Sequence, residues 1–288
     1  GIVGMGGAGF PASVKLSPRS AVDTVLLNGA ECEPYLTCDD RLMREMSDKI
    51  IRGAHYLAAA LGAARIVVGI EKNKPEALAL FEKSDLEVIA LRKRYPMGSE
   101  KHIVYCCTGR KIPAGELPAD VGVSVHNVAT ALAVCEAVEE GKPLFERVIT
   151  VSGAGVETPA NLLVPVGTPL CVLAEQCGVK DTAVKIVVGG PMTGAALAGC
   201  DGVVTKTTSG LLFLTERETN NAAPTPCINC GKCADACPMR LMPMQIEFYA
   251  ASGNFDDAEK YGGVSSCIGC GACSYICPAR RPLTQAIR

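Results

Sequence analysis

The sequence predicts an α/β region, then a small β-rich region with one helix, then a helical region that carries two cysteine motifs. Three observations predict this order. Short apolar runs alternate with segments of helical period from Ala21 to about Glu139, which is typical of a largely parallel sheet. After Gly141, β-branched runs are punctuated by many prolines and glycines. Near the C-terminus, one cysteine spacing occurs twice.

The first domain is expected at residues 1–145. Its apolar runs predict parallel strands, and the segments between them carry apolar residues at helical spacing. The expected strands are residues 22–27, 65–70 and 86–91, with a short fourth strand at 122–125. The expected helices are residues 41–61, 75–83 and 128–139.

The second domain is expected at residues 146–222, including a linker, and the third at residues 223–288. In the second, β-branched runs predict strands at residues 147–152 and 185–188, with a helix at 169–177 between them. A strand from Gly210 leads into a polar linker that contains Asn220 and Asn221. In the third, the segment 242–261 has helical composition, which favours a helical two-cluster domain over the compact β-rich ferredoxin.

The repeated cysteine spacing is C-x-x-C-x-x-C-x-x-x-C-P, by which bacterial-type ferredoxin segments hold cubane iron–sulfur clusters. Three thiolates spaced by two residues wrap one cluster, and the fourth, followed by proline, turns away to ligate the other. Zinc or disulfides are the alternatives, but zinc explains neither the third and fourth cysteines nor the repeat. The expected ligand sets are Cys227, Cys230, Cys233 and Cys277 for one cluster, and Cys267, Cys270, Cys273 and Cys237 for the second. This spacing indicates a chain that carries electrons.

Composition narrows the possible functions. The 288 residues are 48% hydrophobic, enough to bury a sizeable core, and the formal net charge of −2 gives no argument for nucleic-acid binding. No apolar stretch approaches the about 18 residues that a transmembrane helix needs. The eight other cysteines show no second metal-type spacing and are expected to be reduced.

The chain opens on a glycine-rich run from Gly4 to Pro11 that formally contains G-x-G-x-x-G. A Rossmann dinucleotide site is one interpretation, although it needs a preceding strand for which there is hardly room. Close approach of backbone N–H groups to a phosphate or a flat ring is a second, and an ordinary tight turn is a third. Three further segments follow a strand or open a helix, where anions and cofactors bind. They are residues 28–34, 95–101 and 127–130, and they are expected to converge with the glycine run on one cofactor.

The order of these motifs resembles the RnfC family, a component of the Rnf complex, the ion-translocating NADH:ferredoxin oxidoreductase of bacteria. The motifs are G-x-G-G-A-G-F-P, N-G-A-E-C-E-P-Y, D-D-R-L-M-R-E, Y-P-x-G-x-E-K, T-G-R-x-I-P, V-T-K-T-T and the two cysteine runs. The first, second and fourth are also similar to the FMN- and NADH-binding segments of the complex I flavoprotein subunit. The resemblance implies an FMN-binding α/β domain, an SLBB-like β-grasp domain and a helical ferredoxin domain with two 4Fe–4S clusters. Members of this family normally have a further N-terminal domain, so the chain is expected to be a fragment.

The resemblance also implies roles for single residues. Gly4, Gly6, Gly7 and Gly9 approach the flavin or its phosphate, Lys15 lies near the flavin, Asn28 bonds to it, and Asn127 and Thr130 contact its phosphate or ribityl chain. On the nicotinamide side are Glu31 and Glu33, with Glu100 nearby. Phe10 either stacks on the nicotinamide or is a core side chain beside Pro11. Met5 stands where the complex I pattern has arginine, so no contact of that arginine transfers.

The implied function is an oxidoreductase subunit that oxidises NADH through FMN and passes single electrons to two 4Fe–4S clusters. Its implied partners are the membrane subunits of an Rnf-type complex, and it exchanges electrons with ferredoxin only indirectly. Its implied location is the cytoplasmic face of the membrane. One alternative is the related cobalamin reductase of propanediol-utilisation microcompartments. Another is an electron-wire subunit that has lost its flavin.

Overall fold

A computed structural model describes residues 1–219 and 222–288. The predicted linker residues Asn220 and Asn221 lie outside the described residues. The chain forms two compact units, Gly1–Thr215 and Glu216–Arg288, and each is described by itself. Both predicted sheets belong to the first unit, and both cysteine motifs belong to the second.

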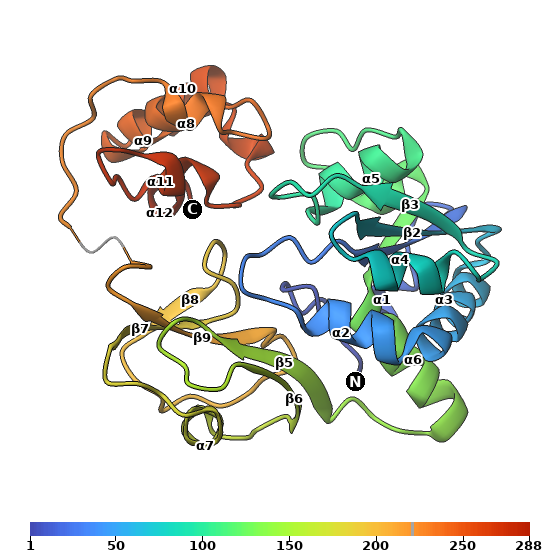
Figure 1. The fold of residues 1–288 in the computed structure, drawn as a ribbon. Coiled ribbons are helices and arrows are strands. Elements are labelled where there is room, and N and C mark those ends of the chain that lie inside the picture. Colours follow the sequence, from blue (N-terminus) through green and yellow to red (C-terminus); the bar gives the residue numbers. More distant parts are fainter. Residues whose placement is uncertain (220–221) are drawn as a thin grey trace. The chain divides into compact units, whose positions relative to one another are not determined.

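The first sheet of the first unit is parallel throughout and has the strand order β3-β2-β1-β4 (Figure 1). The strands are β1 (Thr24–Gly29), β2 (Arg65–Glu71), β3 (Glu87–Leu91) and β4 (Val123–Asn127). Thr24 pairs with Arg65 on one side and with Val123 on the other. The parallel α/β region is therefore confirmed, with β1 at the centre of the sheet.

Helices cover both faces of this sheet because successive side chains of a strand point to opposite faces. Val25 and Leu27 of β1 pack with α2, α3, α4 and α6, whereas Leu26 packs with α5. Figure 1 shows α3 and α6 on one side of the strands and α5 on the other. The helices are α1 (Ala12–Lys15), α2 (Cys38–Glu45), α3 (Ser47–Leu61), α4 (Pro75–Phe81), α5 (Glu100–Thr108) and α6 (Val128–Glu140), with a 3₁₀ turn at Pro118–Val121.

The single helix predicted at residues 41–61 is wrong. The chain breaks at Met46, whose φ of −125° is not helical, so that α2 and α3 are separate helices. The N-terminus of α2 is fixed by the Glu31 carboxylate, while α3 packs closely on α6 at Gly53. Each of the two helices thus has a tertiary contact of its own, and tertiary packing overrides a continuous helical pattern.

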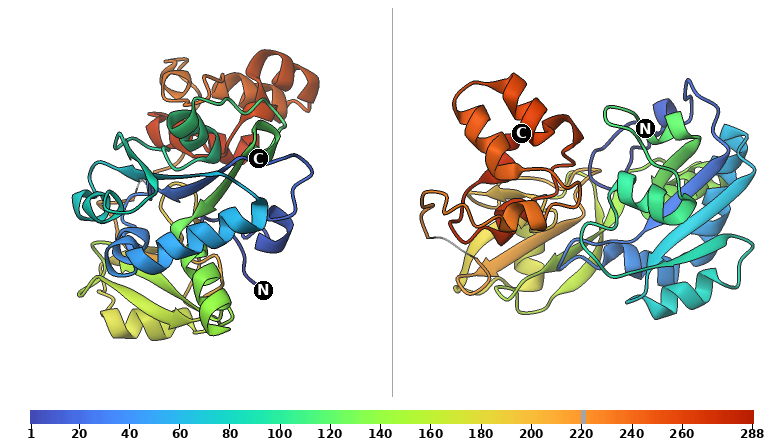
Figure 2. Two further views of the ribbon diagram at one scale, coloured as in Figure 1. Left: turned by 90° about the vertical axis from the view of Figure 1, so that its right-hand side faces the viewer. Right: turned by 90° about the horizontal axis from the view of Figure 1, so that it is seen from above.

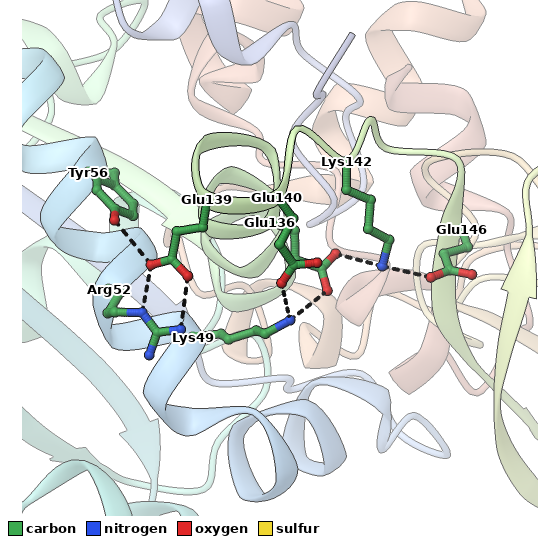
Figure 3. Close-up of polar contacts among 8 residues, drawn as sticks. All are labelled: Lys49, Arg52, Tyr56, Glu136, Glu139, Glu140, Lys142 and Glu146. Atoms are coloured by element: carbon green, nitrogen blue, oxygen red, sulfur yellow. Dashed lines mark hydrogen bonds and ion pairs between the residues drawn. The ribbon is translucent and has the colours of Figure 1, made fainter.

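Charged side chains tie the outer surfaces of α3 and α6 together (Figure 3). Arg52 donates to Glu139 at 2.7 Å, and the Tyr56 hydroxyl donates to the same carboxylate at 3.1 Å. Lys49 lies 2.6 Å from Glu140. Farther along, Lys142 pairs with both Glu136 of α6 and Glu146, the first residue of strand β5 (Glu146–Ser152). Exposed ion pairs of this kind contribute little each, so the buried apolar faces of the two helices carry most of the stability.

The second sheet of the first unit is mixed, with the strand order β6-β5-β9-β7-β8. Strands β5 and β9 are parallel, and the other neighbours are antiparallel. Helix α7 (Leu170–Cys177) lies along one side of it (Figures 1 and 2) and buries Leu170 and Leu173 against Ile149 and Phe213. The strands are β5 (Glu146–Ser152), β6 (Ala160–Pro165), β7 (Ala183–Val188), β8 (Ala195–Leu197) and β9 (Gly210–Thr215).

The second unit is helical, as the composition of its central segment predicted. Its core includes Leu241, Ile246 and Ala258. No helix among residues 1–219 and 222–288 is long and apolar enough to cross a membrane. The helices are α8 (Lys232–Asp235), α9 (Pro243–Ala251), α10 (Phe255–Asp257), a π turn at Ala258–Gly262, a 3₁₀ turn at Val264–Ser266, α11 (Ala272–Ile276) and α12 (Leu283–Ile287).

Candidate flavin and iron–sulfur sites

The glycine-rich run forms a closed loop. Val3 bridges Pro11, and the Gly4 N–H donates to the Phe10 carbonyl at 2.8 Å. Gly7 and Gly9 have φ values of +125° and +66°, which side chains rarely adopt. A Cβ on Gly7 would meet nothing within 4 Å, so the outer face of the loop is open to a ligand.

Thr130 anchors this loop from helix α6. The threonine is 1% exposed, and its hydroxyl accepts a hydrogen bond from the Met5 N–H at 3.0 Å. Met5 is itself 4% exposed, so it packs inward where an arginine would have required solvent or a partner. A Cβ on Gly6 would lie 3.5 Å from the Cβ of Asn127, which places the loop beside the start of α6.

Two asparagines stand side by side where β1 and β4 end. Asn28 and Asn127 are register partners, and this carboxyl edge of a parallel sheet is where α/β proteins bind ligands. Asn28 donates to the Gly98 carbonyl at 2.8 Å and accepts from the Ala30 N–H at 3.2 Å. Asn127 caps α6 by accepting from the Ala129 N–H, and it donates to an Asp39 carboxylate oxygen at 2.6 Å. The segments predicted to converge are therefore together.

Lys15 and Glu100 form an ion pair of 2.8 Å between α1 and the first residue of α5. Their side chains are 27% and 48% exposed, so the pair borders solvent. The resemblance assigned the lysine to the flavin side and the glutamate to the nicotinamide side. The structure places the two side chains in contact.

Glu31 closes the N-terminus of α2. Its φ is +45°, and the oxygens of its carboxyl group accept hydrogen bonds from the N–H groups of Asp39 at 2.6 Å and Asp40 at 3.1 Å. Burial, followed by the negative charge of Asp39, raises the pKa of Glu31 to about 8. Burial also raises the pKa of Asp39. Buried Lys74 supports the same turn by donating to the Ala30 carbonyl at 2.8 Å.

Glu33 points to the second sheet. Its carboxylate accepts hydrogen bonds from the Met192 N–H at 3.0 Å and from the Thr193 hydroxyl, both in the turn between β7 and β8. A Cβ on Gly190 would lie 2.2 Å from a Glu33 oxygen, so the turn closes tightly over the carboxylate. Phe10 is 51% exposed, which rules out the core position that the sequence left open for it.

Sequence reasoning missed the segment of residues 204–208, whose lysine had no assigned chemistry. Lys206 donates to the Gly1 carbonyl at 2.7 Å, and a Cβ on Gly9 would lie 2.7 Å from the Thr207 Cγ2. Arg147, 5% exposed, donates to the Lys206 carbonyl, and its Nε has no hydrogen-bond partner among the described residues. In the sequence this segment is marked by the V-T-K-T-T motif, which by itself predicts no binding or catalytic role. Its position beside the glycine loop is seen in the fold alone.

The eight predicted cysteines of the second unit line two separate cavities. Cys227, Cys230, Cys233 and Cys277 line the first, and Cys237, Cys267, Cys270 and Cys273 line the second. Backbone N–H groups reach the sulfur atoms: those of Asn229 and Gly269 lie 3.4 Å from the sulfurs of Cys227 and Cys267. Four convergent thiols with N–H donors to sulfur are the donor set that a 4Fe–4S cluster requires.

Comparisons with known proteins assign a cofactor-binding domain to each of the two regions. Residues 1–136 match the sequence family described as the Nuo51 FMN-binding domain, and residues 219–278 match a 4Fe-4S dicluster domain. The chain therefore carries domains for FMN and for iron–sulfur clusters.

Relatives share 40–46% identity with most of the chain. The C-subunit of the ion-translocating oxidoreductase complex of Rhodobacter capsulatus is 46% identical over 91% of this chain and 52% of its own. The C-subunit of the proton-translocating ferredoxin:NAD(+) oxidoreductase complex of Clostridium ljungdahlii is 46% identical over 100% of this chain and 65% of its own. The Na(+)-translocating counterpart of Acetobacterium woodii is 42% identical over 90% and 60%. The chain thus spans roughly half to two thirds of the length of these curated relatives.

A solved structure has a similar fold. An NAD+-reducing NiFe hydrogenase in the H2-reduced state aligns with a TM-score of 0.66 over 89% of this chain and 52% of that chain. The identity is 19%, so this likeness concerns the fold alone.

Proposed function

Because the chain belongs to the RnfC family of ion-translocating oxidoreductase complexes, we propose that it takes electrons from NADH at FMN and delivers them to two 4Fe–4S clusters. When bound, FMN converts between two-electron hydride chemistry and the one-electron chemistry of the clusters. The observation that carries the proposal is the convergence of the open glycine loop with Asn28 and Asn127 at the carboxyl edge of the parallel sheet.

The flavin site is assigned to the residues of this edge. The backbone of Gly4, Gly6, Gly7 and Gly9 approaches the ring or the phosphate, and Thr130 positions that loop through Met5. Asn28 and Asn127 orient polar groups of the flavin, since each presents an amide at the end of a strand. Lys15 supplies positive charge, and Glu100 sets its position by the ion pair.

The nicotinamide side is assigned to Glu31, Glu33 and Phe10, with Glu100 at its border. The exposed ring of Phe10 is available for stacking on a planar ligand. Glu31 accepts a hydrogen bond from the backbone at the start of α2, and Glu33 accepts one from the backbone between β7 and β8. Both side chains therefore act by fixing the backbone around the site. No side chain has to act as a general acid or base on the nicotinamide.

The iron–sulfur ligands are assigned from the two cavities. Cys227, Cys230, Cys233 and Cys277 hold one cluster, and Cys237, Cys267, Cys270 and Cys273 hold the other. The second sheet with α7 is proposed to be an SLBB-like β-grasp domain, which makes residues 1–145, 146–222 and 223–288 three functional parts. The chain is proposed to lie at the cytoplasmic face of the membrane, bound to the membrane subunits of an Rnf-type complex. It would exchange electrons with ferredoxin only indirectly.

The experiment is anaerobic reconstitution with FMN, iron and sulfide, followed by titration with NADH. Absorbance reports the flavin, and electron paramagnetic resonance reports reduced clusters. We expect the flavin to bleach and two 4Fe–4S signals to appear. Clusters that dithionite reduces and NADH does not, in a chain that retains no flavin, would contradict the proposal and support an electron wire.

A pair of glycine variants tests the flavin site separately. Gly6→Ala adds a methyl group whose nearest protein neighbour is 3.5 Å away, so the protein itself accommodates it. Gly199→Ala is the matched control, because its added Cβ also meets nothing closer than 3.5 Å. We expect Gly6→Ala to weaken FMN retention at least tenfold and Gly199→Ala to leave it unchanged. Equal retention in both variants would remove Gly6 from the site.

A further inference from the structure

The two cavities of the second unit are copies of one another, offset by 40 residues, as Cys227 and Cys267 show. The offset extends beyond the cysteines: Met244 lines the first cavity and its counterpart Thr284 lines the second. Non-glycine residues with positive φ recur in the same way, at Arg240 (56°) and Arg280 (55°). Each difference between the two linings is therefore a substitution at an equivalent place.

One difference concerns a charged side chain in the cavity lining itself. Arg281 lines the first cavity, and its counterpart in the second is Leu241. The Arg281 guanidinium is held by Glu247 of α9, with Nε 2.7 Å and Nη2 2.6 Å from the two carboxylate oxygens. Glu247 is 6% exposed, and its counterpart Ile287 lines the second cavity. An ion pair in one half thus replaces an apolar pair in the other.

The pair is oriented with its positive end toward the cavity. Arg281 belongs to the described lining of the first cavity, and Glu247 does not. The hydrogen bond to Glu247 raises the pKa of Arg281, so the guanidinium remains charged. Because the guanidinium is nearer than the carboxylate, the net potential that the pair imposes on the cavity is positive.

One-electron reduction adds a negative charge to a bound cluster, and nearby charge and hydrogen bonds to sulfur set its potential. We propose that Arg281, positioned by Glu247, raises the reduction potential of the cluster held by Cys227, Cys230, Cys233 and Cys277. The inference rests on the proposed function, since it requires both clusters. Arg281 touches neither flavin nor substrate in this proposal and acts only through its charge at the cavity wall.

The second cavity has polar neighbours of its own. The Thr284 hydroxyl lies 3.6 Å from the Cys273 sulfur, where the first cavity has the thioether of Met244 at 3.6 Å from Cys233. Exposed Arg288 donates to the Gly269 carbonyl at 3.1 Å. Thr284 and Arg288 therefore lie near the second cavity and not near the first. The proposal therefore concerns the shift that the ion pair causes, and a test must change that pair alone.

The test exchanges the two pairs. Arg281→Leu combined with Glu247→Ile gives the first half the side chains of the second. Replacing a buried ion pair by apolar residues is usually tolerated, and here only the glutamate is buried while the arginine is 31% exposed. Leu241→Arg combined with Ile287→Glu does the reverse. The reconstituted 288-residue chain is titrated potentiometrically under electron paramagnetic resonance. We expect the first double variant to lower one midpoint potential only, and the second to raise the other one only.

Arg281→Lys is the conservative control, because it keeps the charge beside Glu247 while losing the bidentate geometry. We expect its midpoint potentials to stay close to those of the unchanged chain. Two full clusters by iron and sulfide analysis, with neither potential moved in either exchange, would overturn the inference and leave the proposed function intact. Fewer than two 4Fe–4S clusters in the unchanged chain would instead overturn the proposed function.

Discussion

Gly53 of α3 faces the Ala131 carbonyl of α6, and a Cβ on Gly53 would lie 1.9 Å from that oxygen. Helices α3 and α6 therefore touch backbone to backbone at this point. This contact of α3 and the contact of Glu31 with the start of α2 lie on either side of the break at Met46.

Gly53→Ala sets two effects against each other. Helix propensity favours alanine over glycine by about 1 kcal/mol. Overpacking against a backbone atom costs roughly 1–3 kcal/mol or more, because a carbonyl cannot rotate away as a flexible side chain can. We expect the overpacking cost to exceed the gain in helix propensity. Gly53→Ala should therefore lower the free energy of unfolding, measured by hydrogen exchange in α3 and α6.

A matched variant separates the two effects. Ala60→Gly lies on an exposed position of the same helix and changes propensity alone. It is expected to cost at most about 1 kcal/mol, because Ala60 lies in the last turn of α3. If Gly53→Ala proved more stable than the unchanged chain, the close approach of α3 and α6 would be incorrect.

Glu33 should control the turn between β7 and β8. Glu33→Gln keeps the size of the side chain but weakens its bonds to Met192 and Thr193, because a neutral amide is a poorer acceptor than a carboxylate. We expect faster hydrogen exchange at the Met192 N–H, with the N–H of Asp39 unchanged because Glu31 holds it. Unchanged exchange at Met192 would mean that the turn is held by other contacts.

Glu31 predicts a dependence of stability on pH. Its folded pKa of about 8 lies above the ordinary value of 4.5, so the folded state binds the proton more tightly. Protonated Glu31 thus adds to the free energy of unfolding. This stabilisation is complete below about pH 4.5 and is lost as the pH rises through about 8, at up to roughly 1.4 kcal/mol per pH unit. Because glutamine does not titrate, Glu31→Gln is expected to reduce the pH slope of the free energy of unfolding between about pH 4.5 and 8. A Gln variant with the same slope as the unchanged chain would assign the effect to another group, with buried Asp39 as the first to examine.

Much of the fold was predictable because its signals are local. The strands at 65–70 and 86–91 and the helix at 128–139 are continuous apolar or helix-period runs, and they are confirmed within a residue or two. Strands β6 and β8 were missed, since they are edge strands that contain asparagine, proline or only three residues. The break at Met46 was missed because nothing in the local sequence shows that Gly53 must meet Ala131.

The candidate site divides in the same way. The cysteine spacing predicted two groups of four side chains that the fold brings together, since the ligands of each group lie on one short motif plus one crossing residue. The Lys15–Glu100 pair and the contact of residues 206–207 with the glycine loop join segments that are distant in sequence. Such pairs have no local signal, so sequence patterns predicted the members without their partners.

His126 gives a test of the first unit with the opposite sign. It is 3% exposed in β4, its Nε2 lies 2.9 Å from the Ser124 hydroxyl, and burial lowers its pKa to about 3. The ring must therefore stay neutral in the folded state, whereas the unfolded chain takes up the proton near its ordinary value of 6.5. The free energy of unfolding that depends on neutral His126 is complete above about pH 6.5. It is lost as the pH falls toward about 3, by up to roughly 1.4 kcal/mol per pH unit. His126→Asn should remove this loss in hydrogen exchange of the β4 amides, while His55→Asn, at a solvent-exposed ring, should retain it. An equal acid response in all three chains would show that carboxylates, and not the buried imidazole, govern the stability of this strand at low pH.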